Sequence, residues 1–485
     1  MAVPHDITGS LRRNVATYVL VLIVVTRLLM LFTMAPTDRI GEDVTFLRIG
    51  KYVATSGQLL PLVEPVSGIM VYYGPILYWV DALLYMLAPQ GWILLAKAFN
   101  LLLFFGSLFI LSKIAGMFKL ADTEKAVAYG LFGLLTSSVA ISLTNMQEGL
   151  LLFGTMAAAW CVLRKPDRLS YAGLFLASGL VMLTRFQGII SVIGLALMVC
   201  FLRTERKQKL KLLAVMVSGI LVLSGWWYVW NLDVHGTPLY HPDSRISTFS
   251  LEYALTTPVD VHIARVTDAY YQEWGIPLGR GALESSIFSL PAWVVGIVRL
   301  AIGIFLLPLY VLFVLAAWRQ KNELLILLPL PVLFLVHGLL HAPIIASNTA
   351  ARYMLPGIPL FALVTAKALS SFKGRQRKAV LAYMAVAIAV LASLALYSQF
   401  YHAQHENAFL ADFGQLLKQY PDKALVMLER DDLIRGMVDL HFNVTAIKVQ
   451  EIACGNVSTL GMLSYCVQGQ NILVWSDGFY LFKKF

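Results

Sequence analysis

The sequence predicts an α-helical protein that crosses a membrane many times, and three observations support this fold class. Of the 485 residues, 58% are hydrophobic and only 14% are charged, whereas soluble globular proteins carry roughly 25% charged residues. The mean hydropathy is +0.72. Apolar runs of about 18–22 residues recur along the chain, and each is long enough to cross a hydrocarbon core about 30 Å thick. This composition excludes a water-soluble multidomain protein.

We expect about eleven spans, beginning with a retained first helix. The run 15–32 is longer than the core of a signal peptide, and no small-x-small cleavage site follows it, so we place the N-terminus in the cytoplasm. The run 170–202 is interrupted only by Arg185 and Gln187. It would be about 50 Å long as one helix, which predicts two short helices with Arg185 at the turn. The expected spans are 14–34, 92–114, 124–144, 149–163, 170–184, 188–202, 212–232, 290–318, 323–340, 354–370 and 379–399.

The positive charges predict which ends of the spans face the cytoplasm. The formal net charge is +10, and basic residues gather in short clusters between apolar runs, near residues 12–13, 164–168, 203–211 and 373–378. This is the positive-inside pattern of a plasma-membrane (inner-membrane) protein, and it needs no nucleic-acid partner. The four clusters share one side only if the segment 72–89, which contains Pro75 and Asp81, lies in the interface instead of crossing.

This topology places three long polar segments outside: 35–91, 233–289 and 400–485. We therefore expect a membrane module at 1–400, with outer loops 35–91 and 233–289, and a small extracytoplasmic (periplasmic or extracellular) α/β domain at 401–485. In that domain a helical stretch, 409–420, precedes strand-like runs at 424–428 and 471–475. Cys454 and Cys466 would lie in an oxidising compartment and form a disulfide; two free thiols are the alternative.

Acidic residues occur at two places on the expected outer side. Glu42 and Asp43 follow the first span directly, where a partly desolvated carboxylate is suited to act as a general base or metal ligand. Gln147 and Glu148 lie at the outward end of a span, where an ionisable group that faces the bundle is a functional hypothesis by default. The alternatives are a solvated loop for the first pair and a simple interface marker for the second.

Two arginines, Arg185 and Arg352, are expected at the same face. A guanidinium offers fixed donors that match phosphate oxygens, so both are candidates to hold a lipid-linked phosphate; snorkelling to the interface is the alternative. The sequence has no Walker loop, no GxGxxG after a strand, no HExxH and no paired CxxC, and its histidines are not set at a zinc-ligand spacing.

Taken together over residues 14 to 370, these motifs resemble the GT-C superfamily of integral-membrane glycosyltransferases, especially protein O-mannosyltransferases and lipid A aminoarabinose transferases. The matching features are an acidic pair with an aromatic residue four positions after the first acid, a Tyr-Pro-Pro-Leu-like start of a juxtamembrane helix, an acid followed by Leu-Leu-Leu-Phe, and an Arg-Tyr-x-Leu-Pro motif. In this sequence they fall on Glu42, Asp43 and Phe46, on Tyr72 to Tyr78, on Glu148, and on Arg352 to Pro356.

The sequence departs from the family pattern in three respects. The acidic pair is Glu-Asp instead of Asp-Glu, so either Glu42 or Asp43 is the base. Gly74 replaces one proline of the Pro-Pro pair. The lysine that the aminoarabinose transferases place before that pair is missing here, so Arg185 and Arg352, grouped with Tyr73, are expected to supply more of the phosphate binding.

The resemblance implies transfer, with inversion, of a sugar from a polyprenyl-phosphate donor to an acceptor hydroxyl of a protein, lipid or glycan on the outer face. Glu148, with Gln147, would position the acceptor or hold a divalent cation; no cofactor is certain. The expected partners are the donor, the acceptor and membrane lipids, and the chain is expected to be a monomer. The competing interpretations are a transporter or lipid flippase, for which internal repeats and interrupted helices are typical, and a non-catalytic assembly subunit.

Overall fold

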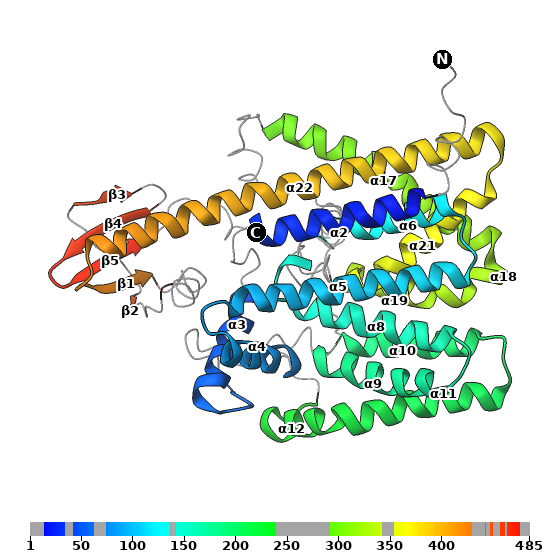
Figure 1. The fold of residues 1–485 in the computed structure, drawn as a ribbon, viewed down its shortest axis with the longest axis horizontal. Helices are drawn as coiled ribbons and strands as arrows, with labels where there is room; N and C mark the ends of the chain where they lie inside the picture. Colours follow the sequence, from blue (N-terminus) through cyan, green and yellow to red (C-terminus); the bar gives the residue numbers. More distant parts are fainter. Residues whose placement is uncertain are drawn as a thin grey trace, which may run out of the picture.

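In the computed structural model, long helices run side by side in a bundle, and a small sheet lies beyond one end of it (Figure 1). This arrangement confirms the expected polytopic α-helical chain with a small C-terminal α/β domain. The structure describes residues 14–33, 42–62, 74–135, 139, 142–185, 187–238, 292–341, 354–428, 442, 447–449, 456–460 and 463–475.

Each expected span overlaps a helix of the bundle. Four helical segments of the described residues are long and apolar enough to cross a membrane by themselves: Val15–Phe32, Trp92–Met117, Arg206–His235 and Gly374–Ser393. The remaining apolar helices are shorter. In chain order the bundle helices are α2 (Val15–Thr33), α5 (Trp92–Met117), α6 (Asp122–Gly133), α8 (Gln147–Leu163), α9 (Arg168–Thr184), α10 (Gly188–Phe201), α11 (Arg206–Gly219), η1 (Ile220–Ser224), α12 (Gly225–His235), α17 (Ala292–Arg319), α18 (Lys321–Leu324), η2 (Leu325–Leu327), α19 (Pro329–His341), η3 (Leu355–Gly357), α21 (Ile358–Lys367), η4 (Ala368–Ser371) and α22 (Gly374–Gln419).

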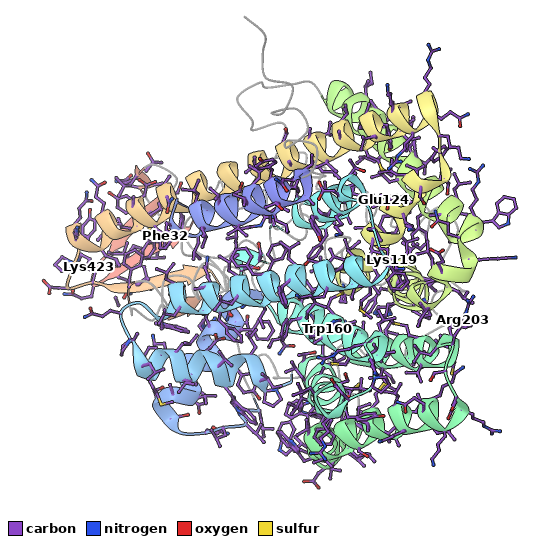
Figure 2. All side chains as sticks on the ribbon, turned by 45° about the vertical axis from the view of Figure 1, so that its right-hand side comes forward. Phe32, Lys119, Glu124, Trp160, Arg203 and Lys423 are labelled. Atoms are coloured by element: carbon purple, nitrogen blue, oxygen red, sulfur yellow. The ribbon has the colours of Figure 1, made fainter. Side chains whose placement is uncertain are left out.

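Three basic clusters lie at one end of the bundle. The α8–α9, α10–α11 and α21–α22 connections, which carry three of the basic clusters, lie together at the right-hand end in Figure 1. Figure 2 shows Lys119 and Arg203 at this end and Phe32 and Lys423 at the other. We call the end with the basic clusters the basic end and the opposite end the site end. Their separation is the arrangement that the positive-inside pattern predicted for these clusters.

Two short helices form a layer at the site end. The first, α3 (Glu42–Ser56), occupies a stretch that the sequence suggested only as a loop, and the second is α4 (Ile76–Leu87). The twelve residues of α4 extend about 18 Å, too short for a hydrocarbon core of about 30 Å. A stacked pair of indole rings, Trp79 and Trp226, 5.9 Å apart, joins α4 to α12. Aromatic side chains of this kind concentrate at membrane interfaces.

Helix α6 is shorter than the expected span 124–144, because it ends at Gly133. Arg27 of α2 donates from Nη2 to the carbonyl of Gly133, and its guanidinium lies 5.4 Å from the ring centre of Phe104. Arg27 is 1% exposed. A cation at the negative end of a helix dipole is favourable, so Arg27 caps α6 inside the bundle.

Glycines allow α9 and the long helix α11–η1–α12 to approach closely. A Cβ atom on Gly219 would lie 2.2 Å from the carbonyl oxygen of Phe175, and one on Gly179 would lie 2.8 Å from the carbonyl oxygen of Gly219. Small residues permit this backbone contact between membrane helices. The Ser178 hydroxyl also donates to the carbonyl of Met216 across the same interface, at 3.1 Å.

The last membrane helix continues into the C-terminal domain. Helix α22 runs from Gly374 to Gln419 without a break at the expected boundary of residues 400 and 401. Its final turns, with Phe409 and Phe413, pack against Leu425, Leu463 and Val474 of the sheet. The sheet has the order β2-β1-β5-β4-β3, in which β2, β1 and β5 are parallel and β4 and β3 antiparallel. The strands are β1 (Ala424–Leu428), β2 (Ile447–Val449), β3 (Ser458–Leu460), β4 (Leu463–Gln468) and β5 (Asn471–Trp475).

The close helix contact predicts that Gly219→Ala destabilises the bundle. The new methyl group meets a backbone oxygen that cannot turn away, and overpacking of this kind costs about 1–3 kcal/mol. The measurement is the thermal unfolding midpoint of the purified protein in detergent. Gly225→Ala is the matched control, because nothing lies within 4 Å of its Cβ position. Equal midpoints for the two variants would contradict the predicted contact.

Candidate functional site

A buried ion pair lies at the site end of the bundle. Arg185 Nη1 donates to Glu148 Oε1, and the two side chains are 2% and 1% exposed. Glu148 is in the first turn of α8, and Arg185 follows α9 in extended conformation as its C-cap. The pair therefore links the starting turn of one helix to the end of the next, over 37 positions of sequence. Both residues were predicted for the site, but their mutual contact was not.

The turn before α4 is joined to the same region through Gly74. Its backbone N–H donates to the carbonyl of Thr184 at 3.1 Å, and its carbonyl accepts from Gln147 Nε2 at 2.8 Å. A Cβ atom on Gly74 would lie 1.6 Å from the carbonyl oxygen of Leu183. Proline has no N–H to donate. The glycine that replaces a family proline is thus required by this contact.

The start of α3 lies in the same neighbourhood. Phe46 is fully buried and packs in one cluster with Leu77, Met146 and Leu150, and the last two flank Gln147 and Glu148. Helix α3 begins at Glu42, four residues before Phe46 and therefore about 6 Å away along the helix axis. The side chains of Glu42 and Asp43 themselves lie outside the described part of the structure.

A chain of hydrogen bonds that the sequence analysis did not assign to the site supports this region from the side. Asn100 of α5 donates from Nδ2 to Asn145 Oδ1 at 2.9 Å, and Asn145 donates to Asp81 Oδ2 of α4 at 2.6 Å. All three side chains are buried. Asn145 is two residues before Gln147, so the chain fixes the segment that leads into α8. A carboxylate within an otherwise apolar helix is the sequence signal that marks Asp81.

Gln187 adds a polar group to the same region. It is completely buried, and within the described residues neither its Nε2 nor its Oε1 has a hydrogen-bond partner. Buried polar groups are normally paired with protein or with ordered water. Its position two residues after Arg185 makes Gln187 a further candidate to contact a ligand at the site end.

The side chains of five predicted residues lie outside the described part of the structure. Tyr73, Arg352 and Cys454 lie outside the described residues, and Glu42 and Asp43 are described only as part of α3. Cys466 is disulfide-bonded, whereas Cys161 and Cys200 are free. Within the described residues, no group of three or more His, Cys, Asp or Glu side chains is placed to hold a metal ion.

Two crystal structures of ArnT from Cupriavidus metallidurans match the chain over most of its length. The apo structure gives a TM-score of 0.56 at 15% identity and covers 90% of this chain and 86% of ArnT. The structure of ArnT bound to undecaprenyl phosphate gives a TM-score of 0.52 at 16% identity, with 88% and 85% covered. The chain has a GT-C fold. This confirms the fold that the resemblance implied.

An oligosaccharyltransferase from Archaeoglobus fulgidus, crystallised with Zn and sulfate, aligns more loosely, with a TM-score of 0.48 at 14% identity over 88% of this chain and 62% of that one. No family model and no curated protein sequence matches the chain. The GT-C fold is therefore recognised here through its three-dimensional arrangement.

The contacts of Gly74 predict that Gly74→Ala displaces the turn before α4 and lowers the thermal unfolding midpoint of the protein in detergent. The added methyl group cannot avoid the Leu183 carbonyl without separating α4 from the end of α9, and such overpacking costs about 1–3 kcal/mol. Gly91→Ala is the control, since its Cβ position has no neighbour within 4 Å. A Gly74→Ala protein with the midpoint of the Gly91→Ala protein would show that the contact is not required.

The ion pair predicts a specific order of stabilities among its variants. Glu148→Gln leaves the Arg185 charge buried without its counter-charge, which is expected to cost about 3–5 kcal/mol. The double variant Glu148→Leu with Arg185→Met removes both charges, and it is expected to unfold at a higher temperature than the single variant. Thermal unfolding in detergent measures both. A double variant less stable than Glu148→Gln would contradict this account.

Proposed function

We propose that the chain is a glycosyltransferase that moves a sugar from a polyprenyl-phosphate donor to an acceptor hydroxyl on the outer face of the plasma membrane. The observation that carries the proposal is the GT-C fold shared with ArnT, which has been crystallised with undecaprenyl phosphate. The convergence of α3, the Gly74 turn, the start of α8 and the end of α9 at one end of the bundle supports it.

Glu42 or Asp43 is the proposed general base. As the carboxylate removes the proton, the acceptor oxygen attacks the anomeric carbon, the bond from that carbon to the phosphate oxygen breaks, and polyprenyl phosphate leaves. A positioned base contributes typically 10²–10⁴-fold to such a step. The packing of Phe46 against Met146 and Leu150 supports this role, because it holds the start of α3 beside the start of α8.

Arg185 is the proposed contact to the donor phosphate, together with Arg352 and Tyr73. A guanidinium has a planar fork of five N–H donors that matches phosphate oxygens, and Nη1 of Arg185 donates to Glu148. Glu148 would thus position Arg185 and limit its rotation. A fixed cation stabilises the charge that develops on the leaving phosphate without reorganising in the reaction. The alternative role for Glu148 is to hold a divalent cation together with Glu42 and Asp43.

The proposed orientation follows from charge. The basic end faces the cytoplasm under the positive-inside rule, which places the site end and the C-terminal domain outside. The donor tail stays in the bilayer, and the acceptor arrives from the aqueous side over the segments 35–91 and 233–289.

The proposal predicts that Glu42→Gln and Asp43→Asn between them abolish transfer. The assay incubates the purified protein with labelled polyprenyl-phosphate sugar and membrane extract as the source of acceptor, and measures released polyprenyl phosphate. We expect the double variant to lose at least about 10²-fold in rate, while its expression and thermal midpoint stay unchanged. Glu205→Gln, an exposed acid at the basic end, is the control. Full activity in the double variant would overturn the proposal.

The same assay separates the competing classes. A transporter or flippase would move the intact donor across a vesicle membrane without releasing its carrier. A non-catalytic assembly subunit would do neither.

A further inference from the structure

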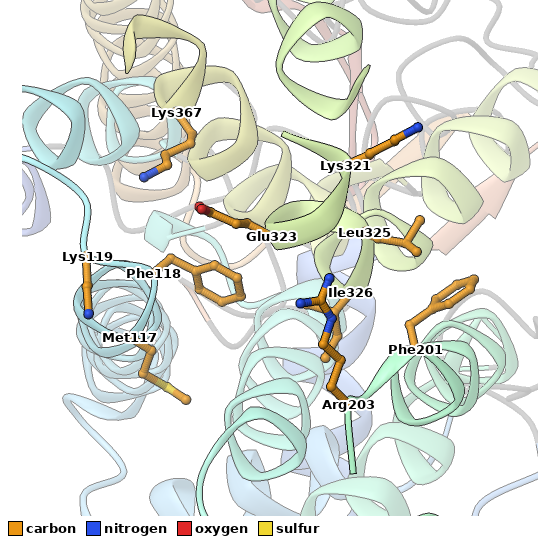
Figure 3. Close-up of a pocket in the computed structure, with 10 residues that line it drawn as sticks. All are labelled: Met117, Phe118, Lys119, Phe201, Arg203, Lys321, Glu323, Leu325, Ile326 and Lys367. Carbon is orange, nitrogen blue, oxygen red and sulfur yellow. The ribbon is translucent and has the colours of Figure 1, made fainter. Parts of the chain in front are cut away.

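A hollow lies at the basic end of the bundle, opposite the candidate site (Figure 2). It is open on one side, has a volume of about 540 Å³, and is lined by the ends of α5 and α10, by α18 with η2, and by the end of α21 (Figure 3). Binding pockets for small ligands range from about 300 to 1,000 Å³. The hollow is therefore large enough for a ligand headgroup.

Positive charge dominates the lining. Lys119 and Lys367 lie on one side of the hollow and Lys321 and Arg203 on the other, with Glu323 between them (Figure 3). Among the described residues, no ion pair engages Lys119, Lys321 or Lys367. A neighbouring hollow shares Glu323 and Lys367 and adds the cation of Arg319. Together the two hollows are lined by five cations and one carboxylate.

The backbone of Lys119 is unusual. Its φ is +50°, and within the described residues it is the only non-glycine residue with a positive φ. Lys119 lies just after α5, and the N–H of the next residue, Leu120, donates to the Ala115 carbonyl at 3.1 Å. In helix ends of this kind, glycine usually occupies the position that Lys119 has here. A lysine here carries a backbone cost that a glycine would not. Backbone strain of this kind is typical of functional positions. The Lys119 side chain lines the hollow.

The remaining wall is apolar and exposed. Met117, Phe201 and Leu325 line the hollow and are 42%, 43% and 44% exposed. They are at the helix ends, where we expect the acyl chains of a bilayer to begin. A soluble anion gains nothing from such side chains, whereas a lipid buries its glycerol backbone and first methylene groups against them.

We propose that this hollow binds the phosphodiester headgroup of an anionic phospholipid from the leaflet at the basic end. Lysine and arginine side chains between membrane helices are suited to such headgroups, and the apolar wall accommodates the attached chains. The site is separate from the proposed transfer reaction and does not depend on it.

The test measures phosphatidylglycerol binding to the purified full-length protein by native mass spectrometry after delipidation, with phosphatidylcholine and glycerol phosphate as comparison ligands. We expect phosphatidylglycerol to bind, and the variant Lys119→Gln/Lys321→Gln/Lys367→Gln to bind it at least tenfold more weakly. The matched control is Lys165→Gln/Lys207→Gln/Lys378→Gln, which removes three exposed cations from the same end outside the hollow. It should stay within twofold of the wild-type protein.

The variant Lys119→Gly distinguishes a loss of lipid binding from a loss of stability. Glycine adopts a positive φ without strain, so this variant should unfold at the same or a higher temperature than the wild-type protein without lipid, yet bind phosphatidylglycerol more weakly. Equal losses in the pocket and control triple variants would overturn the proposal, because they indicate diffuse surface attraction. Equal binding of phosphatidylcholine, or displacement of the lipid by glycerol phosphate alone, would also overturn it.

Discussion

The contact between Glu148 and Arg185 holds together segments that the chain itself does not keep close. Bringing a carboxylate and a guanidinium out of water is costly unless each compensates the other, so the pair is stable only when the start of α8 and the end of α9 meet in one arrangement. The Gly74 turn then attaches to both, through Thr184 and Gln147. The layer formed by α3 and α4 depends on that attachment, and with it the position of the expected acidic pair.

The bilayer imposes a second constraint, since a helix that ends inside the bundle leaves carbonyl groups without partners. Arg27 provides such a partner at the end of α6, because it donates to the Gly133 carbonyl. Near the site end, Asn100, Asn145 and Asp81 instead satisfy one another through side-chain hydrogen bonds.

Hydropathy and charge were sufficient to predict the membrane helices, the common end of three basic clusters and the two residues of the ion pair, because apolar runs and interfacial charges are local properties. The pairing of Glu148 with Arg185 was not predictable, since no periodicity encodes the relative position of side chains 37 residues apart. Helix α3 was missed because its mixed polar composition reads as a loop. The capping role of Arg27 was not predicted, because this residue lies inside an apolar run. Lys119, Lys321 and Lys367 are single cations outside the clusters that the sequence displays, and only the fold gathers them.

Helix α22 connects the membrane to the C-terminal sheet as one uninterrupted rod. At 1.5 Å per residue its 46 residues extend about 69 Å, and Phe409 and Phe413 fasten the far end to the sheet. A tilt of roughly 10° at the membrane would sweep that end by about 12 Å over this length. A continuous helix of this length would therefore turn a small tilt among the membrane helices into a large displacement of the C-terminal domain.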